Sequence, residues 1–176
     1  MAGRRALAGG GLVAVVVGVV LFLVGCGGKY QRTVVKDPCR LLDRSLVRQL
    51  TGSDRGTGGA PSPGQWGCDW RSGDGISLTV GVTVFKSRRY GDDVHAARRS
   101  YEGMRRQEVG QTRLIPIKNV DGKACWHARP GTMEVLVHRY DVVARVTYTG
   151  TRPAANRHVK REQIARLLAE NLMHHL

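Results

Sequence analysis

Acidic residues are scarce in this sequence, and the motifs of many common enzyme families do not occur in it. The 176 residues include 14 Asp and Glu against 28 Lys and Arg, which gives a formal net charge of +14. There is no GxSxG, HExxH, Walker or SxxK pattern, and no GxGxxG pattern ahead of an expected helix. These patterns supply nucleophiles, metal ligands and phosphate-binding loops. We therefore expect a protein that is not an enzyme, with no catalytic residues, metal site or cofactor.

Other absences narrow the class further. Only one apolar stretch is long enough to reach across a membrane, which excludes a polytopic membrane protein. The hydrophobic content of 41% excludes a wholly disordered chain. The positive charge would suit nucleic acid, but helix-turn-helix spacing, zinc-finger spacing and aromatic stacking motifs are all missing. We therefore expect no nucleic-acid partner.

The N-terminus has the pattern of a secretory signal. Arg4 and Arg5 precede an uncharged stretch at 6–25, and Leu-Val-Gly-Cys at 23–26 ends it. These last four residues resemble a bacterial lipobox, in which the cysteine thiol becomes the site of lipid attachment. Cys26 is thus the candidate lipidated residue. An uncleaved anchor is the alternative, because an uncharged stretch of about twenty residues can just span a bilayer.

Both alternatives place the rest of the chain outside the cytoplasm, because the two arginines stay inside. We expect a cell-membrane protein, lipid-anchored at the extracytoplasmic face. Its predicted parts are a signal peptide at 1–25, a lipid tether at 26–36 and a single domain at 37–176.

Hydrophobic periodicity predicts an α+β fold for that domain. The expected order is helix, two strands, helix, three strands, helix. The strands form a twisted antiparallel sheet of about five strands, with helices mainly on one face. Residues 51–65 are rich in Gly, Ser, Pro and Thr without an apolar period, so we expect a mobile loop there. The expected elements are 38–51, 66–70, 76–84, 93–107, 124–129, 133–137, 142–149 and 156–173, with a further candidate strand at 112–115.

Three cysteines remain outside the cytoplasm, where disulfide bonds persist. Cys39 falls in the first turn of an expected helix and Cys68 on the apolar side of a strand, so we predict a Cys39–Cys68 disulfide. Spacing alone does not fix the connectivity, and pairing of Cys68 with Cys125 stays open. As a free thiol, Cys125 is either a small apolar residue or a redox site. His127 is expected to be exposed. Cys125 and His127 together would supply only two metal ligands, which is too few for a zinc site.

Three motifs follow the lipobox: Asp-Pro-Cys-Arg-Leu-Leu at 37–42, Cys-Asp-Trp at 68–70 and Val-Asp-Gly-Lys-Ala at 120–124. With them, the chain resembles the actinobacterial envelope lipoproteins that carry the domain of unknown function numbered 3558. The resemblance spans most of the chain after Cys26. It implies an envelope lipoprotein and no catalytic residues. The tether here is shorter than is common in that family, and Cys125 is extra to its pattern.

We therefore expect a lipid-anchored binding or accessory module. The sheet and residues 51–65 would form any ligand surface, because loops on a rigid scaffold often carry recognition. Two alternatives are an envelope enzyme whose site assembles only in three dimensions and a thiol-redox partner acting through Cys125. Basic residues of two expected helices are candidates for contact with anionic lipid or cell-wall polymer: Arg98, Arg99, Arg105, Arg106, Arg157, Lys160 and Arg161.

Overall fold

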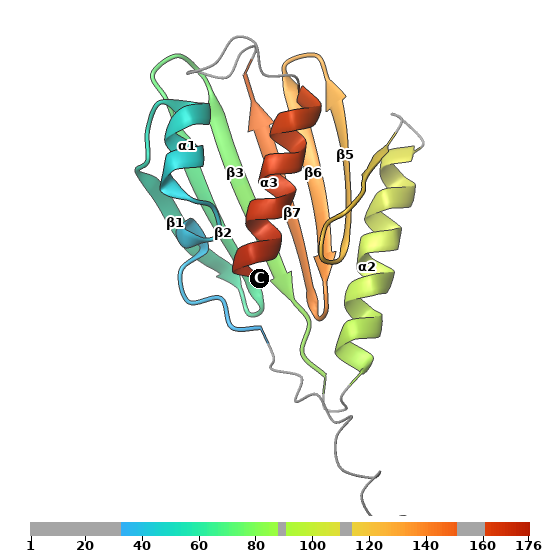
Figure 1. The fold of residues 1–176 in the computed structure, drawn as a ribbon. Coiled ribbons are helices and arrows are strands. Elements are labelled where there is room, and N and C mark those ends of the chain that lie inside the picture. The colour runs from blue at the N-terminus through green and yellow to red at the C-terminus, as the bar shows by residue number, and fades with distance from the viewer. Residues whose placement is uncertain (1–32, 88–90, 110–113, 151–160) are drawn as a thin grey trace, which may run out of the picture. The chain divides into compact units, whose positions relative to one another are not determined.

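The computed structural model describes residues 33–87, 91–109, 114–150 and 161–176 (Figure 1). It confirms the α+β class. A short 3₁₀ helix, three α-helices and seven strands occur in the order η1 (Pro38–Arg40), α1 (Arg44–Thr51), β1 (Gly56–Ser62), β2 (Gln65–Arg71), β3 (Ser77–Val84), α2 (Asp92–Val109), β4 (Ile115–Ile117), β5 (Lys123–Arg129), β6 (Thr132–Arg139), β7 (Val142–Thr149) and α3 (Arg161–His175). Val35, which precedes η1, is buried and so is already part of the packed structure.

All seven strands belong to one sheet with the order β1-β2-β3-β7-β6-β5-β4, and every neighbouring pair is antiparallel. Two meanders, β1–β3 and β4–β7, are joined where β3 pairs with β7 over the full length of both strands. The prediction of about five strands is therefore wrong. The two additional strands, β1 and β4, are the two edges of the sheet.

The strand β1 lies inside the segment 51–65 that was predicted to be a mobile loop. All seven of its residues are exposed, so no side chain is selected for burial and no apolar period arises. Its pairing with β2 aligns Gly58 with Cys68 and Gly59 with Gly67. This strand is defined by its backbone pairing with β2 and buries no side chain. Its composition therefore resembles that of a loop.

The expected helix at 38–51 is two helices. Asp37 caps η1 by accepting a hydrogen bond from the Cys39 N–H, and Gly52, at φ 76°, ends α1 as expected. Between the helices, Asp43 is extended, and its N–H donates to Asn171 Oδ1 of α3 at 2.7 Å. The Asp43 N–H thus bonds to α3 and not to a carbonyl within its own helix. One continuous helix from 38 to 51 is therefore interrupted at Asp43, and α1 begins after it.

Alternate residues of the central strands face opposite layers. One face packs with α1 and α3 into the main core, and both helices lie in front of the sheet in Figure 1. On the other face, Ala97 and Tyr101 of α2 pack on Cys125, Leu136 and Val143. Helices were predicted mainly on one face, and the structure places two α-helices on one face and the third on the other. The α2 layer covers β6 and β7, so that among the described helices β1 to β3 have packing partners on one face only.

The remaining elements shift at their ends. The described part of the last helix runs from Arg161, and its predicted start at Asn156 lies outside the described residues. The candidate strand at 112–115 meets β4 only at Ile115, with residues 112 and 113 outside the described chain.

Candidate functional site

The lipidation site Cys26 and the predicted signal peptide lie outside the described residues. Within the part of the chain that the structure describes, no helix combines the length and apolar character needed to cross a membrane.

The predicted basic residues do not form a single surface. Arg98, Arg99, Arg105 and Arg106 are exposed on α2. Arg161 is exposed at the start of α3, which packs on the opposite face of the sheet from α2. Arg157 and Lys160 lie outside the described residues. Glu102 of α2 partly offsets these charges, because it pairs with Arg105 at 3.3 Å and with Lys123 at 3.2 Å.

The predicted disulfide between Cys39 and Cys68 is confirmed. It joins η1 to the middle of β2, with the two Cα atoms 5.1 Å apart and a sequence separation of 29. The bond holds the start of the domain against the sheet.

Cys125 is not part of the disulfide and is buried under α2. Tyr101 and Cys125 are both buried, and this burial, together with a hydrogen bond to Cys125, raises the pKa of the Tyr101 hydroxyl. His127 was expected to be exposed, and that was wrong. It is 4% exposed, and its Nε2 lies 3.4 Å from Glu134 Oε2 on the neighbouring strand. Among the described residues, no three His, Cys, Asp or Glu side chains are placed to hold a metal ion.

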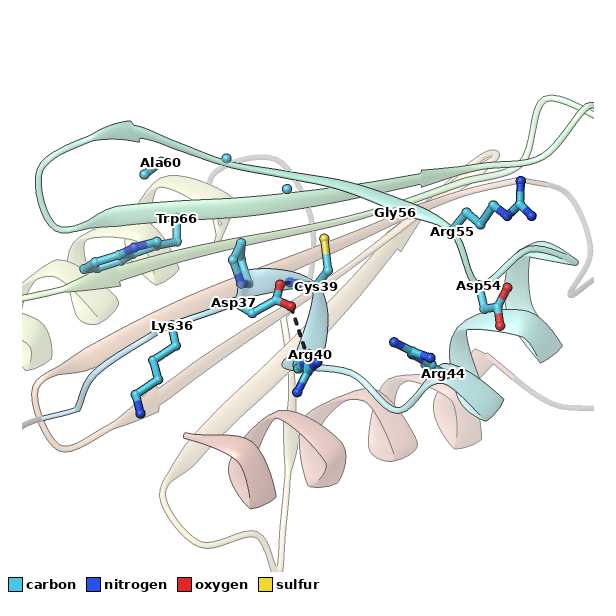
Figure 2. Close-up of a pocket in the computed structure, with 13 residues that line it drawn as sticks. Lys36, Asp37, Cys39, Arg40, Arg44, Asp54, Arg55, Gly56, Ala60 and Trp66 are labelled. Atoms are coloured by element: carbon cyan, nitrogen blue, oxygen red, sulfur yellow. Dashed lines mark hydrogen bonds and ion pairs between the residues drawn. The ribbon is translucent and has the colours of Figure 1, made fainter.

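The candidate site is a pocket of about 940 Å³ between η1 and β1 (Figure 2). It extends from Trp66 and Lys36 at one end to Asp54 and Arg55 at the other. Its lining comes from three stretches of the chain that the disulfide brings together: Lys36, Asp37, Pro38, Cys39, Arg40 and Arg44; Asp54, Arg55, Gly56, Gly58, Gly59 and Ala60; and Trp66. Six of these residues belong to the segment 51–65 in which we expected a ligand surface.

Glycine in β1 is what lets η1 come this close. A Cβ on Gly58 would lie 2.9 Å from Cys39 Sγ and 3.3 Å from Pro38 Cγ. A Cβ on Gly56 would lie 2.6 Å from Cys68 Sγ. A side chain at Gly58 would therefore push Cys39 and η1 away from the strand, and one at Gly56 would collide with Trp70 and Cys68 of β2. The next glycine, Gly59, has no atom within 4 Å of such a Cβ and simply leaves the wall of the pocket open.

The charge in the pocket is unbalanced, with four cations against two carboxylates. Both carboxylates already have partners: Asp37 pairs with Arg40 at 3.3 Å, and Asp54 pairs with Arg48 at 2.5 Å. The hydrogen bond from Arg48 holds the pKa of Asp54 below its usual value, and the charge of Arg44 adds to this effect.

Three cations of the lining remain available. Lys36, Arg44 and Arg55 form no ion pair with any residue that the structure describes. Figure 2 shows Lys36 on one side of η1 and the two arginines on the other. A negatively charged ligand lying along the pocket would therefore meet a cation at each end.

Sequence reasoning missed Lys36, Arg40, Arg44 and Trp66 as site residues. The available signal was the disulfide: once Cys39 is joined to Cys68, the residues flanking Cys39 must lie beside β2 and its neighbour. A predicted strand at 56–62 would have been needed to see that they meet a strand rather than a loop.

Comparison of the chain with protein-family models, with curated proteins and with solved structures gives no significant match. The fold and this pocket therefore define the molecule: a disulfide-linked α+β domain with an open basic pocket at one edge of its sheet.

Proposed function

We propose that this protein is an envelope lipoprotein that binds an anionic ligand in the basic pocket. In this proposal it is anchored through Cys26 at the extracytoplasmic face of the cell membrane. The lipid part of the proposal rests on the signal pattern, the lipobox and the resemblance to the family with domain 3558. The binding part rests on one observation, the three cations of the pocket that lack a carboxylate partner among the described residues.

The short tether limits where such a ligand can be. Thr33 is held in the domain by a hydrogen bond from its Oγ1 to Asp141 at 2.9 Å. Thr33 follows Cys26 by only seven positions. Seven extended residues reach at most about 25 Å. A lipid on Cys26 would therefore keep the pocket within the zone next to the bilayer, where anionic lipid head groups and wall polymers are found.

Binding is favoured over catalysis by the chemistry of the lining. The described lining residues include no His, Ser, Thr or Tyr, and the sulfur of Cys39 is in the disulfide. Of the two carboxylates, Asp54 has a lowered pKa and an arginine on it, which makes it a weak base. The lining thus offers positive charge, an indole and open backbone, which suit recognition.

Charge reversal within the pocket tests the binding part. The full-length protein in a non-ionic detergent is titrated with fluorescent inorganic polyphosphate at low and at moderate salt. Arg44→Glu with Arg55→Glu is expected to weaken binding by at least about tenfold, because each reversed charge near an anion changes the interaction by about 1 kcal/mol or more. Binding of the unmodified protein should weaken as salt is added.

Arg98→Glu with Arg99→Glu is the matched control, because it changes the charge equally on the exposed face of α2. If the α2 variant loses as much binding as the pocket variant, the pocket is not the site and the α2 surface is. The lipid part is tested separately by the intact mass of the membrane-bound protein and of its Cys26→Ala variant. An unlipidated chain that keeps residues 1–25 would overturn it.

A further inference from the structure

The strand β1 is an open edge of the sheet. It pairs with β2 on one side, and no other described strand pairs with it on the other. All of its residues are exposed, and Gly56, Gly58 and Gly59 carry no side chain to shield the backbone. An unpaired row of backbone N–H and C=O groups is a template for another strand.

The opposite edge is protected. The strand β4 has only three residues, and the middle one is Pro116, which has no N–H to donate. Natural sheets commonly close their edges by short strands, by proline or by bulges. In β1 such protection comes only at the far end, where the register with β2 becomes irregular between Gly59 and Ser62 and where Pro61 lies. The stretch Gly56–Gly59 pairs regularly and is left open.

This open stretch forms a wall of the basic pocket. Gly56, Gly58 and Gly59 all line the pocket, Arg40 and Arg44 lie across it from β1, and Arg55 directly precedes Gly56. A strand added to β1 would turn every second side chain toward η1, because successive side chains of a strand point to opposite faces. Those side chains would meet the cations, and the others would face solvent.

We propose that the ligand of this pocket is an extended peptide segment with acidic residues at alternate positions, which adds to the open edge of β1. This deepens the proposed function and rests on it, since the same pocket is used. A peptide supplies both donors and acceptors to the backbone of β1, and its carboxylates supply the charge. A polyphosphate accepts hydrogen bonds only, so it would leave the carbonyl groups of the edge without partners. The half-buried indole of Trp66 lies at the end of this path and can pack against one further side chain.

The test uses peptides that differ in pattern but not in charge. Full-length protein in a non-ionic detergent is titrated with a fluorescein-labelled peptide of alternating Thr and Glu. A block isomer of the same composition places all Glu residues together. Two further versions of the alternating peptide carry N-methyl groups on every Thr or on every Glu. N-methylation removes hydrogen-bond donors along one edge of the peptide and keeps its charge.

Pairing with β1 predicts that the alternating peptide binds at least about tenfold more tightly than the block isomer. At least one of the two methylated versions should lose about tenfold in affinity. Hydrogen exchange of the segment 56–62 should slow when the peptide is bound, because outer amide groups of β1 become hydrogen-bonded. Arg44→Glu with Arg55→Glu should abolish the preference for the alternating peptide, and Arg98→Glu with Arg99→Glu should not.

The other outcomes separate the two proposals. In one outcome, all four peptides bind equally; in another, only polyphosphate binds. If binding in either case still depends on Arg44 and Arg55, edge pairing is wrong and the proposal of an anion-binding pocket stands. If neither the peptides nor polyphosphate bind in a way that depends on these arginines, both proposals fail.

Discussion

The two halves of the sheet are stabilised in different ways. In the half formed by β1 to β3, the described helices cover one face, the outer strand β1 is paired with β2, and a disulfide joins η1 to β2. In the half formed by β5 to β7, α3 packs on one face and α2 on the other, so that most residues of β6 are buried. The first half adds a covalent bond and a close approach of η1 to one apolar layer, and the other half buries apolar side chains in two layers.

The difference bears on function. A three-residue helix such as η1 has too few side chains to be held by apolar burial alone, and the disulfide fixes its position instead. Because η1 is short, it leaves part of β1 uncovered and the cations beside it accessible. The half that buries less thus forms the pocket, while the half that buries more ends in a short strand containing proline.

Loss of the disulfide should have the largest effect. Replacing Cys39 and Cys68 by Ala is expected to lower the free energy of unfolding by about 3–4 kcal/mol, the chain-entropy value for a loop of this length. Denaturant unfolding measures the change. Limited proteolysis should then cut first between η1 and β2, in the half that has lost its covalent link.

Cys125, which lies in the other half and outside the disulfide, provides the control. Cys125→Ala removes a buried sulfur from under α2 and is expected to cost about 1 kcal/mol. If the double substitution costs no more than this, the disulfide is not what holds the first half together.

The next largest expected difference in stability is between alanine substitutions at two neighbouring glycines of β1. Gly58→Ala would place a Cβ 2.9 Å from Cys39 Sγ, closer than real Cβ contacts, and should cost about 1–3 kcal/mol of stability. Gly59→Ala meets nothing within 4 Å and should change stability by about 0.5 kcal/mol or less. Thermal or denaturant unfolding of the two variants measures the difference.

A second background identifies the cause of the Gly58→Ala effect. In the protein without Cys39 and Cys68 sulfurs, Gly58→Ala should cost clearly less, because the atom it collides with is gone. An equal cost in both backgrounds would mean that Gly58 acts through the backbone of β1 and not through the closeness of η1.

The same contrast explains what the sequence could predict. The strands β3 and β5 to β7 have one or both faces buried, so apolar residues recur along them and the pattern predicts their positions well. The strand β1 buries no side chain, so periodicity carries no information about it. The sequence therefore predicted a loop where the structure has the edge strand that lines the candidate site.

The cysteines and the helix at 38–51 show two further limits. The pairing of Cys39 with Cys68 was predictable, because one cysteine lies at the start of the domain and the other faces the core. The break at Asp43 was not, because it depends on a hydrogen bond from Asp43 to Asn171, distant in sequence. The cations of the pocket were missed for the same reason, since contacts distant in sequence bring them together.

Within the better-covered half, one arginine joins sheet and helix. Arg139 at the end of β6 donates from Nη1 to the carbonyl oxygen of Met173 and from Nη2 to Asp121 Oδ2, both at 2.6 Å. Arg139→Met keeps the stem and removes both bonds, and should cost about 1–2 kcal/mol. Arg106→Met, on the exposed face of α2, is the control and should change little. Equal effects of the two substitutions in denaturant unfolding would show that the contact with α3 contributes nothing.

The smallest expected effect is a pH dependence that belongs to the half covered by α2. Burial lowers the pKa of His138 below its ordinary value of 6.5, and the charges of Lys123 and Arg98 lower it further. A backbone hydrogen bond with Tyr140 and the charge of Glu102 act in the opposite direction. The unfolded chain therefore binds the proton first as the pH falls, and folding stability is greatest above about pH 6.5 and decreases as the pH falls through that value.

His138→Gln should reduce this decrease, because the group that must be kept neutral in the folded state is gone. The measurement is the difference in the free energy of unfolding between about pH 8 and pH 5.5, compared with the same difference for His95→Gln. His95 is exposed on α2, so its substitution should leave the slope nearly unchanged. If His138→Gln keeps the full decrease, the buried imidazole under α2 is not its source. The pH sensitivity would then have to be sought in the half of the sheet that carries the pocket.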